Sequence, residues 1–174
     1  MRRAAGVPQR EENMSRAKPR TPGRPVPGWM KKQMLLQLPA GYIRQLSLAN
    51  HLALVGCCSE ASLRHSLNEL IRVVYLSYFL WEAGYAHAPA ALFLDAERAL
   101  DDAVLRAMET GVWRLVNDEA DILKQIVAVH DDQLARVTGR AYVEARRRLE
   151  MLLSASPTAS PIRKRWAECA GASD

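Results

Sequence analysis

Apolar residues recur at the three- and four-residue spacing of α-helices over most of the chain from position 29 onward. This spacing places apolar side chains on one face of a helix. It predicts a short helix over 29–38 that Pro39 ends, helices over 40–55 and 59–83, and three more that start near Pro89, Asn117 and Thr138. We find no sustained alternation of apolar and polar residues, as a β-strand would show. We therefore expect an all-α fold, a single bundle of four or five helices over 29–153.

Particular residues predict where these helices begin and end. Gly56 is placed as a stop for the helix over 40–55, and Ser59 is a good N-cap for the next one. Asn117 or Asp118 can cap the helix that follows, because their side chains accept hydrogen bonds from the first free N–H groups. The pair Thr138-Gly139 is expected to break the pattern before the last helix of the bundle.

One stretch, VVYLSYFLW over 73–81, is apolar almost all round, which is typical of a central, buried helix. Five of the eleven aromatic residues of the chain lie within 75–85. They are Tyr75, Tyr78, Phe79, Trp81 and Tyr85. Their concentration has two interpretations. They form the core, or they form an exposed face through which the chain makes a homodimer or binds a protein partner.

The two ends of the chain have a different composition. Residues 1–28 are rich in proline and glycine and have almost no periodic apolar pattern, so we expect a disordered basic arm. Residues 154–174 are rich in Ser, Ala and Pro, and we expect a flexible tail in which only 162–166 has the composition to dock. The residues REEN before Met14 resemble a translated ribosome-binding site, which makes Met14 the expected start.

The net charge of +5 is unevenly distributed. Residues 1–32 hold nine Lys and Arg against two Glu, whereas residues 33–152 hold twelve against fifteen acids. The predicted bundle is therefore mildly acidic, and the excess of positive charge belongs to the arm. The three cysteines do not form the pattern of a secreted disulfide framework, and no apolar run is long enough to span a bilayer. We expect a cytoplasmic protein without a membrane partner.

The stretch SRAKPRTPGRPVPGWMKK over 15–32 carries six positive charges and no negative one. Its KPRTPGRP resembles an AT-hook, whose Arg-Gly-Arg-Pro core lies in the narrow minor groove of A·T-rich DNA. Gly23, Arg24 and Pro25 match that core, but Pro22 stands where the first arginine belongs. The arm is therefore expected to contact nucleic-acid phosphates without sequence preference. The residues that would do so are Arg16, Lys18, Arg20, Arg24, Lys31 and Lys32.

A second basic element lies in QLARVTGRAYVEARRRL over 133–149, which resembles a helix-turn-helix in outline. Ala135 and Gly139 have the four-residue spacing of that motif, and Arg140 and Arg147 would face the nucleic acid. An ordinary helix–loop–helix of a bundle explains the segment equally well. In either case the i,i+4 spacing predicts the ion pairs Glu144 with Arg148 and Arg146 with Glu150.

The sequence offers little for catalysis. It contains no glycine-rich phosphate-binding motif. His51, Cys57, Cys58 and His65 lack the paired spacing of zinc ligands, and the carboxylates Glu97 and Asp101, or Asp131 and Asp132 with His130, are expected to be solvated helix residues. We therefore expect no enzyme, no metal and no cofactor.

Two functional hypotheses remain. The first is a non-enzymatic regulatory or accessory protein, resembling a transcription regulator, whose basic arm binds nucleic acid and whose helical domain forms a homodimer or binds a protein partner. The alternative is a helical adaptor or structural subunit without a nucleic-acid role, in which the arm is a proline-rich tether to a partner.

Overall fold

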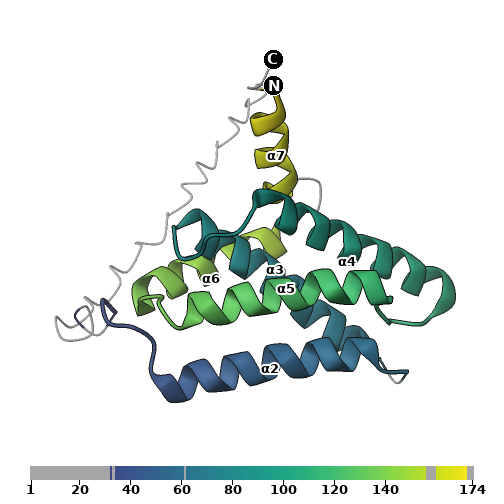
Figure 1. Cartoon of the computed structure of the whole chain (residues 1–174), viewed down its shortest axis with the longest axis horizontal. Helices are drawn as coiled ribbons and strands as arrows, with labels where there is room; N and C mark the ends of the chain where they lie inside the picture. The colour runs from purple at the N-terminus through teal and green to yellow at the C-terminus, as the bar shows by residue number, and fades with distance from the viewer. Residues whose placement is uncertain (1–31, 33, 61, 156–159, 172–174) are drawn as a thin grey trace, which may run out of the picture.

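The computed structural model describes residues 32, 34–60, 62–155 and 160–171. These residues form a bundle of six helices and no named strand (Figure 1). The helices are α2 Ala40–Cys58, α3 Arg64–Glu82, α4 Ala90–Thr110, α5 Asn117–Leu134, α6 Gly139–Ser154 and α7 Pro161–Gly171. The five helices predicted for the body of the chain correspond to α2 through α6. The prediction of a single all-α bundle is confirmed.

Helix α3 is the centre of the bundle. It packs against α2, α4, α5 and α6, more neighbours than any other described helix has. The run from Val73 to Leu80 is almost continuously buried, as its all-round apolar pattern predicts. Across from it, Phe93 of α4 is fully buried and meets the ring of Tyr78 edge-on at 5.7 Å between centroids. This contact places the aromatic residues of α3 and α4 in one shared core.

The predicted boundary between α2 and α3 is wrong. Helix α2 runs through Gly56 to Cys58, and Ser59 ends it instead of starting α3. Both the N–H and the hydroxyl of Ser59 donate to the carbonyl of Gly56, at 3.3 and 2.9 Å. These bonds satisfy the end of α2, and α3 begins only after Leu63. Gly56 is needed here for close packing, because a Cβ at this position would lie 2.9 Å from the hydroxyl of Ser66.

The start of α5 also differs from the prediction. Neither Asn117 nor Asp118 is the cap; the residue before the helix is Val116, whose N–H donates to the carboxylate of Glu119 at 2.8 Å. Arg106 of α4 holds the same carboxylate with a 2.6 Å ion pair. A long-range partner therefore fixes Glu119 where it closes the first turn. By contrast, the predicted break before α6 is confirmed, since Thr138 caps that helix.

In the segment before α2, Lys32 is helical but the described residues from 34 onward are not. The short helix expected over 29–38 does not reach its predicted end, because residues 34–36 form a turn and Gln37 pairs with Thr138 in an isolated antiparallel bridge. Pro39 then precedes the first residue of α2, as predicted. The reason for the change is tertiary: the carbonyls of Met34 and Leu36 bond to α6 instead of to a helical turn.

The C-terminal residues form a docked helix instead of a flexible tail over Pro161–Gly171. Ile162 is buried, with 3% of its surface exposed. It belongs to 162–166, the part of the tail whose composition allows docking. The Arg163 guanidinium donates to the buried carboxylate of Glu97 at 3.1 Å, and the hydroxyl of Tyr78, whose main acceptor is Glu82, lies 3.3 Å from the carbonyl of Pro161. Helix α7 therefore joins the bundle through one apolar anchor and a set of polar contacts to α3 and α4.

A buried polar network links α3 to α5. The side-chain amide of Gln133 donates to the carbonyl of Ser77 at 2.9 Å, and its oxygen accepts from the hydroxyl of Ser77 at 2.9 Å. The same oxygen lies 3.2 Å from Nδ1 of His130, so that nitrogen carries the proton. All three side chains are buried. The network satisfies polar groups that would otherwise be costly in the core.

Burial lowers the pKa of His130 below its ordinary value of 6.5, with the hydrogen bond to Gln133 and the charge of Asp131 acting in the opposite direction. The unfolded chain therefore takes up a proton near pH 6.5 that the folded protein does not. We expect the free energy of unfolding to fall as the pH drops below 6.5, by up to about 1.4 kcal/mol per pH unit. Urea unfolding at a series of pH values, with His130→Gln as the comparison, measures this slope. An equal slope in both proteins would contradict the assignment.

Candidate nucleic-acid interface

Residues 34–38, which follow the basic stretch and which we call the arm root, lie across the start of α6. The N–H of Gly139 donates to the carbonyl of Leu36 at 2.9 Å, and the N–H of Arg140 donates to the carbonyl of Met34 at 2.6 Å. The bridge between Gln37 and Thr138 extends this contact by one residue. A Cβ at Gly139 would meet the backbone of Met34 at 3.5 Å, which shows how closely the two segments approach. The arm therefore joins the bundle beside the first turn of α6.

These bonds use up the backbone donors at the start of α6. Besides the two N–H groups held by the arm root, the N–H of Ala141 donates to the hydroxyl of Thr138 at 3.3 Å. The N–H of Tyr142 donates to the carbonyl of Thr138 at 3.0 Å. An open helix N-terminus is a common anion site, but here all four donors are taken. A phosphate at this end of the bundle would have to bind to side chains.

The exposed side of α6 supplies such side chains. Arg140 and Arg146 are exposed, and neither forms an ion pair with another described residue. Arg147 is also exposed but donates two hydrogen bonds to Glu144, at 3.0 and 2.7 Å. That bonding raises the pKa of Arg147 and lowers the pKa of Glu144. The positive charge that remains open on α6 is therefore on Arg140 and Arg146.

The ion pairs of α6 are not the predicted ones. Glu150 binds Arg72 of α3 at 2.9 Å, so it is not the partner of Arg146. Arg148 binds Glu82 of α3 at 2.5 Å and lies over the ring of Phe79 at 4.2 Å from its centroid. The local i,i+4 rule fails because partners on α3 offer better geometry than neighbours one turn away. Sequence reasoning consequently missed Arg146 as a candidate, and no local signal could have found it.

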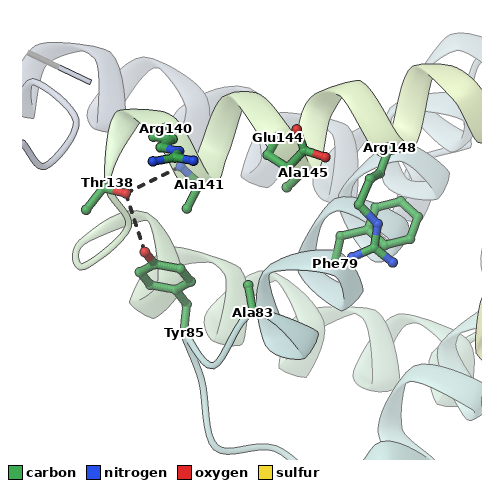
Figure 2. A pocket seen from close by; sticks show the side chains of 9 residues that line it. All are labelled: Phe79, Ala83, Tyr85, Thr138, Arg140, Ala141, Glu144, Ala145 and Arg148. Carbon is green, nitrogen blue, oxygen red and sulfur yellow. Dashed lines mark hydrogen bonds between the residues drawn. The ribbon is translucent and has the colours of Figure 1, made fainter. Parts of the chain in front are cut away.

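Two pockets flank the first half of α6. The first, of about 320 Å³, lies between α6 and the end of α3, with Arg140 and Arg148 among the residues that line it (Figure 2). In Figure 2 the hydroxyl of Tyr85 approaches Thr138 at 3.4 Å beneath the start of α6. Because Arg148 is engaged by α3, Arg140 is the open cation of this pocket.

The second pocket, of about 490 Å³, lies between the arm root and α6. Its lining includes Met34, Leu36, Tyr42, Tyr142 and Arg146. The rings of Tyr42 and Tyr142 meet edge-on with their centroids 6.1 Å apart. Burial raises the pKa of Tyr142, so its hydroxyl stays neutral. The pocket thus combines an apolar and aromatic surface with one cation, so each of the two pockets beside α6 has one open arginine, Arg140 or Arg146.

The remaining predicted nucleic-acid residues belong to the arm. Lys32 is described and exposed. The others, Arg16, Lys18, Arg20, Arg24 and Lys31, lie outside the described residues. Lys32 stands two residues before Met34, whose carbonyl accepts from the N–H of Arg140 in α6.

The packing expected for a helix-turn-helix is absent between α5 and α6. Ala135 is exposed, although the motif needs a small buried residue there. Gly139 approaches the backbone of Met34 instead of α5, and α6 packs mainly on α3. The outline of helix, four-residue connection and helix is present, and its packing favours the ordinary helix–loop–helix over the helix-turn-helix that the segment resembles.

The five aromatic residues over 75–85 lie in or against the core. Tyr78 and Phe79 are buried at 2% and 3% exposure and cannot reach a partner. Tyr75, Trp81 and Tyr85 are half-buried and pack against the core cluster. Trp81 donates its indole N–H to the carbonyl of Ala88 at 3.0 Å. The packing favours the core interpretation for Tyr78 and Phe79, and the other three side chains keep part of their surface exposed.

The residues considered for metal binding or catalysis have other partners. His51 lies 2.8 Å from a carboxylate oxygen of Asp131. Cys57 is buried, and that burial raises the pKa of its thiol to about 11. Glu97 is buried between Arg163 and the hydroxyl of Tyr75, which donates to it at 2.5 Å. Over the described part of the chain, no group of three or more His, Cys, Asp or Glu residues is placed to hold a metal ion.

Among the described helices, none combines the length and the apolar character needed to cross a membrane. Comparison of the chain with known protein families, with characterised proteins and with solved structures found no match.

Proposed function

We propose that this protein is a non-enzymatic regulatory or accessory factor that binds nucleic acid through one cationic surface. That surface consists of the basic stretch over 15–32 together with Arg140 and Arg146 of α6. The observation that carries the proposal is the docking of residues 34–38 against the start of α6. It joins the most basic part of the sequence to the open arginines of a domain that is otherwise mildly acidic.

The surface acts by neutralising phosphates. Six positive charges over 15–32 precede in the sequence a domain whose residues 33–152 carry more acids than bases. Two further charges, on Arg140 and Arg146, are exposed on α6. A polyanion would be repelled from most of the domain and attracted to this end of it. Contacts of this kind position the protein on nucleic acid but do not read its sequence. The proposal therefore includes no sequence preference.

Replacing Arg140 and Arg146 together by alanine tests the contribution of the domain. Both side chains are exposed, so the fold is retained. We expect duplex DNA to bind about tenfold or more weakly at low salt, and the log–log salt slope to shrink by about 2. Fluorescence anisotropy with labelled DNA measures both quantities.

The matched control removes two exposed positive charges elsewhere, with Arg98→Ala on α4 and Lys124→Ala on α5. The net charge of the two double variants is equal, so a general loss of charge would weaken both alike. We expect the control to bind like the original protein. Equal weakening of both variants, or no effect of Arg140 and Arg146, would overturn the proposal for the domain and favour a protein-binding adaptor.

A further inference from the structure

Helix α2 has a composition that does not fit its position in the fold. It has a single Lys, Arg, Asp or Glu among its 19 residues, Arg44. Yet it lies along one edge of the bundle, where Figure 1 shows no described element on its outer side. A surface helix normally presents a charged and polar face to water. The outer face of α2 is therefore a surface that the described chain leaves without a partner.

The apolar residues on that outer face form one line. Leu48, Leu52 and Val55 are exposed at 60%, 61% and 67%. Their four- and three-residue spacing is that of the a and d positions of a coiled-coil seam. The inner face of α2 is separate, since Ala53, Leu54 and Cys57 are the residues it buries in the bundle. The helix thus has two apolar faces, of which the fold uses one.

The charges at the two ends of this line identify the occupant. Arg44 stands eight residues before Leu52, and Glu60 stands eight residues after it, in the turn beyond α2. Both residues are exposed, and neither forms an ion pair with another described residue. If a second copy of α2 lies antiparallel on the first, with the two-fold axis near Leu52, Arg44 of each copy comes beside Glu60 of the other. A parallel arrangement would instead bring like charges together.

We propose that the protein forms a homodimer through the outer faces of α2, which pair antiparallel about a two-fold axis near Leu52. A surface that is complementary to itself about one axis is what an isologous dimer requires. The pairing buries the Leu48, Leu52 and Val55 side chains of both copies and provides two symmetric Arg44–Glu60 ion pairs. It uses neither the arm nor α6, so it stands independently of nucleic-acid binding.

Sedimentation equilibrium of the full chain tests the pairing. The sample is treated with nuclease, so that nucleic acid cannot bridge two copies, and kept reduced, so that the exposed Cys58 cannot cross-link them. We expect a concentration-dependent species of twice the 19.4 kDa chain mass. A strict monomer at every concentration would overturn the proposal.

The variant Leu52→Glu places a charge at the centre of the seam and is expected to raise the dimer dissociation constant about a hundredfold. The matched control is Leu105→Glu on α4, because Leu105 is exposed at 60% and Leu52 at 61%. The control is expected to remain a dimer. Equal effects of the two substitutions would show that the dimer uses another surface and would overturn the assignment to α2.

Charge reversal tests the antiparallel geometry without altering the apolar seam. Arg44→Glu and Glu60→Arg are each expected to raise the dissociation constant about tenfold, because each brings like charges together. The double variant Arg44→Glu with Glu60→Arg restores the pairs and is expected to dimerise like the original protein. Absence of this rescue would overturn the proposed arrangement.

Discussion

Replacing Phe93 by alanine is expected to lower the free energy of unfolding by about 3–5 kcal/mol. Phe93 has no exposed surface, and its ring contacts Tyr78 and Trp81 at centroid distances of 5.7 and 5.4 Å. The substitution removes apolar surface and leaves a cavity where α4 meets α3. Because both neighbours are large rings fixed by hydrogen bonds to Glu82 and Ala88, the site cannot collapse to fill the space. Urea unfolding followed by circular dichroism measures the loss.

The control for this substitution is Phe93→Leu, which keeps most of the apolar volume. We expect it to lose clearly less stability than the alanine variant, because the remaining cavity is smaller. A loss below about 1 kcal/mol for Phe93→Ala would mean that α4 does not pack against the aromatic residues of α3.

The second large effect concerns the polar network between α3 and α5. Replacing Gln133 by alanine is expected to cost about 2–4 kcal/mol, because it leaves the hydroxyl of Ser77 and the Nδ1–H of His130 buried without partners. The same unfolding measurement reports this loss. Because the loss of stability comes from the unpaired polar groups, it should be smaller in a variant that also lacks one of those groups.

A double-mutant cycle separates this cause from simple loss of packing. Ser77→Ala removes one of the stranded groups, so the double variant Ser77→Ala with Gln133→Ala should cost less than the sum of the two single variants. Additive losses would show that the two side chains do not interact, which would contradict the network.

The helices could be predicted from the sequence because their apolar spacing is local information. The periodicity of α3 and the runs of α4, α5 and α6 need no knowledge of the partner helices. The errors lie at helix ends. Ser59 closes α2 by bonds to the carbonyl of Gly56, and Glu119 is held at the start of α5 by Arg106 of α4. Helix α7 was expected as a tail because its composition is polar, and its helical form is accompanied by contacts to Glu97 and Tyr78 far away in the chain.

The sequence predicts the positive charge of the candidate site but not its geometry. The sequence indicates a basic arm and a basic helix, but not that the arm root docks on the first turn of that helix, because backbone hydrogen bonds leave no residue pattern. The sequence does not identify Arg146 as an open cation, because its expected ion-pair partner Glu150 binds Arg72 instead. Long-range pairing of side chains thus decides which arginines remain open.

The central claim is that the arm and α6 form one cationic surface, and the salt dependence of binding tests it most directly. With six phosphate contacts from the arm and two from α6, the log–log slope of affinity for duplex DNA against salt is expected to be about −7. Deleting residues 15–32 should leave a slope of about −2, and adding Arg140→Ala and Arg146→Ala to the deletion should abolish binding. An unchanged slope after the deletion, or no binding by the intact chain at low salt, would contradict the account.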